Sequence, residues 1–168
     1  MTTQVAINGF GRIGRNVLRQ YFQSPSAQES FAITAINDLT NAQTLAHLLK
    51  YDSIHGRFQG EVSATDTELR VNGTNIRVFA EKDPAKLPWK SSNVSLVLES
   101  TGIFTKRSGA ELHLNGGAKK VLISAPSPDP DLTLAFGVNT ESYNPSEHHV
   151  VSCASCTTNC LAPVAKVL

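Results

Sequence analysis

The spacing of three glycines near the start of the chain constrains the fold more than any other feature. Gly9, Gly11 and Gly14 form a G-x-G-x-x-G pattern directly after the apolar run at 5–7. The pattern alone is weak because glycine is common, but here it opens a segment with apolar residues at helical spacing. A second apolar run, 31–36, follows that segment. The opening therefore predicts a strand, a tight turn, a helix and a second strand parallel to the first.

Each glycine has its own physical task in such a turn. Gly9 allows the tight turn, Gly11 lets backbone approach a pyrophosphate, and Gly14 lets the helix pack closely on the strand. The free N–H groups and positive dipole end of the helix attract phosphate charge. Asp38 lies 29 residues after Gly9, at the end of the second strand, where a carboxylate accepts hydrogen bonds from ribose hydroxyls and repels a 2′-phosphate. These features predict NAD binding, with NAD preferred over NADP. The alternative is that the glycines only shape a turn and Asp38 caps the next helix.

The rest of the chain extends the same pattern. Further short apolar runs lie at 94–98, 121–123, 134–136 and 150–151. Residues 41–50 carry leucines on one helical face behind an Asn or Thr cap. Asn72-Gly73 predicts a two-residue hairpin turn within a meander that we interpret as an insertion or edge element. The prediction is an α/β fold of the Rossmann type, with a doubly wound, mostly parallel sheet of about six strands.

Composition excludes several classes of protein. With 168 residues, 40% of them hydrophobic and 17% charged, the chain has enough apolar material for one core and is unlike a disordered segment. Fifteen Lys and Arg against fourteen Asp and Glu give no electrostatic footprint for nucleic acid or an anionic membrane. No apolar run approaches the roughly 18 residues that span a bilayer, and no basic leader precedes an apolar core. We therefore expect a cytoplasmic protein without nucleic-acid or membrane partners.

Seven segments in family order resemble the glyceraldehyde-3-phosphate dehydrogenases, the phosphorylating, NAD-dependent enzymes of glycolysis. They are INGFGRIGR (7–15), IND (36–38), YDSIHGRF (51–58), STGIF (100–104), GAKKVLISAPS (117–127), FGVN (136–139) and ASCTTNCLAP (154–163). The last segment is highly specific. The erythrose-4-phosphate dehydrogenases share most of these motifs, and Ala125 after Ser124 favours the glyceraldehyde family by one residue only.

The resemblance implies a role for each matching residue. Arg12 and Ile13 match pyrophosphate contacts, Lys82 an adenine-side contact, and Ser124 a contact near the nicotinamide. Thr101 and Gly102 match a strand-end segment beside the cofactor. The expected cofactor-binding set is Gly9, Gly11, Arg12, Ile13, Gly14, Asp38, Lys82, Thr101, Gly102 and Ser124. Cys156 matches the catalytic nucleophile, and Ser155, Cys156 and Thr157 match the substrate site. Glyceraldehyde 3-phosphate and inorganic phosphate are the implied substrates, and a homotetramer is the implied assembly.

The three cysteines of the chain all lie between positions 153 and 160. Cys156 falls where a helical pattern begins, and the free N–H groups of a helix start favour a thiolate. We expect Cys156 to be the reactive thiol, Cys160 an inert packed thiol and Cys153 the last residue of a strand. Cys153 and Cys156 also form a C-x-x-C pair, and with Cys160 and His148 or His149 they would supply enough zinc ligands. Neither alternative has its usual sequence context, so no metal is expected.

The residues beyond Cys156 are few. The resemblance implies a histidine base about 25 to 30 residues after the nucleophile and a later arginine for the substrate phosphate, but no histidine lies between Cys156 and Leu168. The last helical pattern also lacks a Gly or Asn stop signal. We expect residues 1–152 to be an NAD-binding domain and 153–168 the first helix of a truncated catalytic domain, inactive alone. The alternative is a non-catalytic NAD-binding module.

Overall fold

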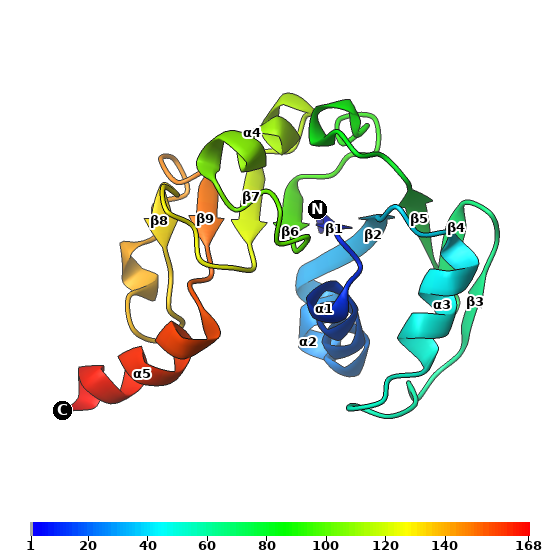
Figure 1. The fold of residues 1–168 in the computed structure, drawn as a ribbon, viewed down its shortest axis with the longest axis horizontal. Helices are drawn as coiled ribbons and strands as arrows, with labels where there is room; N and C mark the ends of the chain where they lie inside the picture. The colour runs from blue at the N-terminus through cyan, green and yellow to red at the C-terminus, as the bar shows by residue number, and fades with distance from the viewer. Residues whose placement is uncertain (1) are drawn as a thin grey trace.

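Nine strands, counted over the residues 2–168 that the computed structural model describes, form one mostly parallel sheet (Figure 1). The strands are β1 (Thr3–Asn8), β2 (Phe31–Asn37), β3 (Val62–Ala64), β4 (Glu68–Val71), β5 (Thr74–Phe79), β6 (Leu96–Glu99), β7 (Lys120–Ile123), β8 (Leu132–Thr133) and β9 (Val150–Ser152). The helices are α1 (Arg12–Gln23), α2 (Pro25–Ser30), α3 (Ala42–Lys50), α4 (Arg107–Asn115) and α5 (Cys156–Val167), with short 3-10 helices at Pro84–Lys86 and Thr140–Ser142. Within the same residues, no helix combines the length and the apolar character needed to cross a membrane.

The strand order confirms the predicted Rossmann-type fold. The sheet runs β3-β4-β5-β2-β1-β6-β7-β9-β8. From β5 to β9 neighbouring strands pair in parallel, and in chain order this six-stranded part has the 3-2-1-4-5-6 arrangement of dinucleotide-binding folds. The order reverses between β1 and β6, so the carboxyl ends of these strands leave a crevice where such folds bind ligands.

Helices cover both faces of the sheet. Successive side chains of β1 point to opposite faces, so β1 contributes to an apolar core on each face. Val5 and Ile7 join the core under α1 and α3, whereas Ala6 joins the core on the opposite face with Trp89. Figure 1 shows α1 and α2 on one side of the sheet and α4 on the other. The Ser24-Pro25 pair ends α1 and also starts α2, because the Ser24 side chain caps that helix and Pro25 occupies its first turn.

The predicted meander is confirmed, and one predicted strand is wrong. The Asn72-Gly73 turn forms as predicted, with positive φ at both residues, and the meander β3-β4-β5 lies at one edge of the sheet, where β5 pairs with β4 on one side and in parallel with β2 on the other. The run at 134–136 is not a strand. The Asn139 side chain accepts a hydrogen bond from Ala135 N at 2.9 Å and donates one to Thr133 O at 3.0 Å. These bonds turn the chain just after β8.

Candidate functional site

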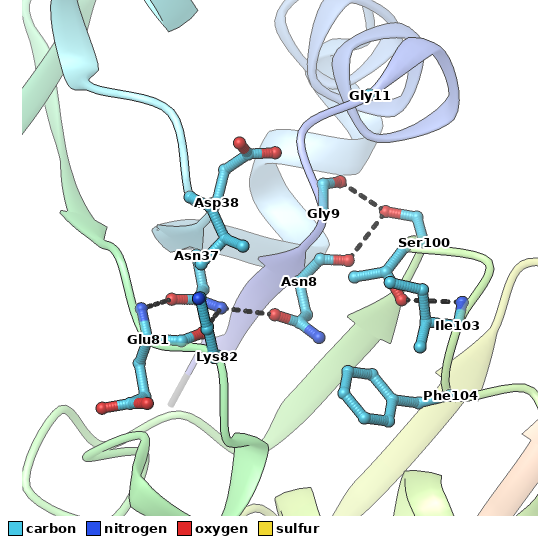
Figure 2. A pocket seen from close by; sticks show the side chains of 12 residues that line it. Asn8, Gly9, Gly11, Asn37, Asp38, Glu81, Lys82, Ser100, Ile103 and Phe104 are labelled. Atoms are coloured by element: carbon cyan, nitrogen blue, oxygen red, sulfur yellow. Dashed lines mark hydrogen bonds between the residues drawn. The ribbon is translucent and has the colours of Figure 1, made fainter.

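A cleft of about 480 Å³ lies at the carboxyl ends of β1, β2 and β6, where the strand order reverses. Figure 2 shows the residues that surround it. They are Asn8, Gly9, Gly11, Asn37, Asp38, Leu39, Glu81, Lys82, Ser100, Thr101, Ile103 and Phe104. Five of the residues expected to bind a cofactor are among them, namely Gly9, Gly11, Asp38, Lys82 and Thr101.

The glycine turn that closes one side of the cleft uses each glycine differently. Gly9 has a φ of +90°, and a Cβ there would lie 2.7 Å from Thr101 N. A Cβ on Gly14 would collide with Gly9 O and the side chain of Ile7. Gly11 has no protein atom within 4 Å of a would-be Cβ and lines the cleft, so the room it leaves is open to a ligand. Gly11 also caps the start of α1 without a side chain, which leaves free N–H groups there.

Asp38 holds the glycine turn against the second strand. Its Oδ2 accepts a hydrogen bond from Phe10 N at 2.8 Å, and its Oδ1 accepts one from Thr40 N at 3.0 Å. Asp38 does not cap α3, because Asn41 does so by accepting from Thr44 N at 2.8 Å. Each carboxylate oxygen has a second lone pair. The carboxylate therefore has acceptor capacity left for the hydroxyls of a ribose.

The wall on the β6 side is fixed to the glycine turn. Ser100 Oγ lies 2.7 Å from Gly9 O and 3.1 Å from Asn8 O (Figure 2). Thr101 Oγ1 accepts a hydrogen bond from Ile103 N at 3.1 Å, which bends the chain through Gly102 with its φ of +74°. The cleft thus has two walls held by hydrogen bonds, one after β2 and one after β6.

Five of the expected cofactor contacts lie outside the lining of the cleft, namely Arg12, Ile13, Gly14, Gly102 and Ser124. The Arg12 guanidinium pairs with Asp52 at 3.5 Å. Backbone N–H groups of His55 and Ile54 hold the pKa of the Asp52 carboxyl well below its usual value, so Asp52 is an anion at neutral pH. Ser124 follows β7, and its Oγ donates to Glu99 O at 3.1 Å.

Cys156 lies at the same edge of the sheet, beyond β9, as the first residue of α5. Ser155 caps this helix by accepting a hydrogen bond from Thr158 N at 2.9 Å, and Cys156 and Thr157 are exposed. The turn from β9 into α5 passes through Ala154, which has a φ of 60°, a conformation that costs a non-glycine residue energy. A strained turn therefore presents the thiol at a helix start.

The other two cysteines differ from expectation. Cys160 is exposed, and α5 has no buried residue among those described, so Cys160 is not packed. Cys153 follows the end of β9 by one residue, and burial raises the pKa of its thiol. All three cysteines are free. Within residues 2–168 no group of three or more His, Cys, Asp or Glu side chains could hold a metal.

Sequence reasoning missed the polar residues beneath the cleft. Asn8, Asn37 and Glu99 are the last residues of β1, β2 and β6 and are almost fully buried. The signal was present, since each is a polar residue directly after an apolar run. Parallel pairing of the three strands brings these ends together. An apolar run in the sequence predicts a strand but not the strand with which it pairs.

Comparison with known proteins identifies the family. A family model described as "Glyceraldehyde 3-phosphate dehydrogenase, NAD binding domain" matches residues 3–107. The chain belongs to the glyceraldehyde 3-phosphate dehydrogenase family. Glyceraldehyde-3-phosphate dehydrogenase 1 of Bacillus cereus is 58% identical over 166 residues, covering 99% of this chain and 48% of the relative.

Two further relatives show similar identity and coverage. The glyceraldehyde-3-phosphate dehydrogenase of Geobacillus stearothermophilus is 57% identical over all of this chain and 49% of its own length. That of Thermotoga maritima is 54% identical over 98% of this chain and 49% of its own length. The chain thus spans about half the length of the family members it matches.

Proposed function

We propose that residues 1–152 are the NAD-binding domain of a phosphorylating glyceraldehyde-3-phosphate dehydrogenase and that residues 153–168 begin its catalytic domain. One observation carries the proposal. The cleft lies where the strand order reverses, and Gly9, Gly11 and Asp38 lie together around it. A dinucleotide needs a close backbone approach for its pyrophosphate and a carboxylate for its ribose at this place. The family match over residues 3–107 supports the same cofactor.

The residues of the chain fit NAD as follows. Gly11 and the free N–H groups at the start of α1 take the pyrophosphate, with Arg12 and Ile13 beside them. Asp38 takes the adenosine ribose, and Lys82 lies on the adenine side. Thr101, Gly102 and Ser124 serve the nicotinamide side. When bound, NAD supplies the acceptor for a hydride.

Cys156 is the nucleophile of the proposed reaction. Its Sγ adds to the aldehyde carbon of glyceraldehyde 3-phosphate, and oxidation leaves the acyl group joined to Sγ as a thioester. An oxygen of inorganic phosphate then attacks the thioester carbon and frees the thiolate, giving 1,3-bisphosphoglycerate. Ser155 and Thr157 flank Cys156 and are proposed to bind substrate and phosphate oxygens. The proposal includes a cytoplasmic location, which suits three free cysteines, and an oligomeric enzyme, the homotetramer that the resemblance implies.

Calorimetric titration of the chain with NAD and with NADP tests the proposal. We expect NAD to bind more tightly, because the 2′-phosphate of NADP would meet the Asp38 carboxylate. Asp38→Ala should weaken NAD binding and narrow the difference between the two cofactors by about 1 to 3 kcal/mol, the value of a hydrogen bond to a charged group. Asp66→Ala is the control, because Asp66 is an exposed acid that accepts a hydrogen bond from Gln43 and is not among the residues that line the cleft. No binding of NAD, or an unchanged ratio in Asp38→Ala, contradicts the proposal.

A further inference from the structure

Four buried polar side chains form a row beneath the cleft. Asn8 pairs in register with Asn37 on one side and with Glu99 on the other, so the three lie next to one another across β2, β1 and β6. Their exposed fractions are 1%, 5% and 1%, and His113 of α4, which joins the row at Glu99, is 0% exposed. Buried polar groups are costly unless they are hydrogen-bonded. The donor and the acceptor in each hydrogen bond of the row can be derived from the groups that bond to its two ends.

The first end is a backbone N–H group. Glu81 N can only donate, and it donates to Asn37 Oδ1 at 2.9 Å. The Asn37 amide group must then donate, and it does so to Asn8 Oδ1 at 2.7 Å (Figure 2). Asn8 Nδ2 in turn donates to Glu99 Oε2 at 2.5 Å. The orientation of both asparagines is therefore fixed. Asn37 Nδ2 donates to Asn8 Oδ1 and to Glu81 O at 2.9 Å, and Asn8 Nδ2 faces Glu99.

The second end is an indole. Trp89 Nε1 can only donate, and it lies 3.0 Å from His113 Nδ1. His113 therefore carries its hydrogen on Nε2, which donates to Glu99 Oε2 at 3.1 Å. Asn8 Nδ2 also lies 3.3 Å from His113 Nε2, but both atoms are donors here, so they share the carboxylate oxygen. The hydrogen bonds that start at Glu81 N and those that start at Trp89 Nε1 therefore both end at Glu99.

The other oxygen of Glu99 holds the wall of the cleft. Glu99 Oε1 accepts from Thr101 N at 2.8 Å and from the Thr101 hydroxyl. Asn8 Nδ2 and His113 Nε2 thus donate to one oxygen of Glu99, and Thr101 N donates to the other. The Thr101 hydroxyl oxygen has two lone pairs of its own, and one of them accepts from Ile103 N at 3.1 Å. Thr101 and Ile103 both line the cleft.

We propose that Glu99 is a positioning residue for the nicotinamide half of bound NAD. Asp38 follows β2 and Thr101 follows β6, on opposite sides of the glycine turn after β1. If Asp38 takes the adenosine ribose, as the proposed function on which this inference rests requires, the wall that Glu99 holds faces the other half of the dinucleotide. His113 and Asn8 fix the carboxylate, and the carboxylate fixes Thr101 and Ile103.

Glu99→Gln tests the bonding pattern without changing side-chain size. Neither Asn8 nor His113 can accept a hydrogen bond from the new amide group, whereas the Thr101 hydroxyl can turn and accept. The amide group should therefore face Thr101, and Thr101 N loses its acceptor. We expect amide hydrogen exchange at Thr101 and Ile103 of the ligand-free chain to accelerate about tenfold or more. Asp66→Asn, which removes the charge of an exposed acid outside the lining of the cleft, should leave exchange at both amides unchanged. Unchanged exchange in Glu99→Gln overturns the proposal.

Binding experiments then separate this inference from the proposed function. By calorimetry, Glu99→Gln should weaken NAD about fivefold or more while AMP binding stays within about twofold, and Asp38→Ala should weaken both ligands. If Glu99→Gln does not fold, Thr101→Val removes only the hydroxyl and should give a smaller loss that is again confined to NAD. Equal losses for NAD and AMP overturn the positioning role. Absence of NAD binding by the unchanged chain overturns the proposed function, and the exchange result still decides whether Glu99 holds the wall.

Discussion

Three cysteines within eight residues occupy three different environments. Cys153 is half-buried, and burial raises the pKa of its thiol. Cys160 is exposed in the body of α5, where the backbone N–H groups are already bonded within the helix. Cys156 is exposed at the first position of α5, where the N–H groups are free and the helix dipole favours an anion. Exposure separates Cys153 from the other two, and only position in the helix separates Cys156 from Cys160.

We predict that Cys156 reacts with iodoacetamide faster than Cys160, and that Cys153 reacts most slowly. The reason is that the thiolate is the nucleophile, and the helix start stabilises it. Peptide mapping after brief treatment at neutral pH measures the order. In Cys156→Ser, Cys160 should keep its unchanged slow rate. Equal rates at Cys156 and Cys160 in the unchanged chain would mean that exposure alone sets reactivity.

At the scale of elements, Asp131 connects β8, β9 and α4. Its Oδ2 accepts from His149 N at 2.7 Å and Val150 N at 2.8 Å, and its Oδ1 lies 3.1 Å from the Arg107 guanidinium at the start of α4. Burial raises the pKa of this carboxyl, but the two backbone hydrogen bonds and Arg107 outweigh it and leave the pKa below its ordinary value. The folded state therefore prefers Asp131 ionised.

We predict that Asp131→Asn lowers the free energy of unfolding at neutral pH by about 1 kcal/mol, since asparagine keeps one acceptor oxygen and water screens the ion pair. A carboxyl whose pKa is lower in the folded state stabilises the fold above its unfolded pKa of about 3.9, and this contribution is lost as pH falls through the folded value. The variant should therefore lose less stability than the unchanged chain below about pH 4. Urea unfolding at a series of pH values measures the free energy of unfolding of the variant and of the unchanged chain. A difference between the two that is the same at every pH would contradict the role of Asp131.

The elements that sequence patterns predicted well are those fixed by neighbouring residues. The G-x-G-x-x-G spacing, the Asn41 cap and the Asn72-Gly73 hairpin are each marked by residues a few positions apart, and all three elements form as expected. The pairing of β5 with β2 and the row beneath the cleft depend on residues far apart in sequence. For the same reason Gly11 and Asp38 could be assigned to a nucleotide site, whereas Glu99 and His113 could not.

Across the whole molecule, the proposed cofactor cleft and Cys156 share one edge of the sheet, but α5 extends away from the sheet (Figure 1). Its apolar residues Leu161, Val164 and Val167 are 62%, 55% and 87% exposed. If residues 153–168 begin a catalytic domain, as proposed above, we expect further residues of that domain to cover this helix. The imidazoles of the described residues also lie away from Cys156. His148 and His149 precede β9 whereas Cys156 follows it, His113 is sealed beneath the cleft, and His47 and His55 lie on or after α3, beyond β2.

We predict that a polypeptide limited to these 168 residues binds NAD but shows no measurable phosphate-dependent oxidation of glyceraldehyde 3-phosphate. Within residues 2–168, the histidines lie on other elements or loops than the β9–α5 turn that carries Cys156, and general base catalysis contributes about 10²- to 10⁴-fold. Without a group that holds the substrate phosphate, the gain from positioning is lost as well. The assay is NADH absorbance with aldehyde, NAD and phosphate, and calorimetry on the same sample confirms that the cleft binds NAD. Cys156→Ala provides the background. Activity within about tenfold of a full-length relative, abolished in Cys156→Ala, would show that a proton acceptor within these residues suffices for the proposed reaction.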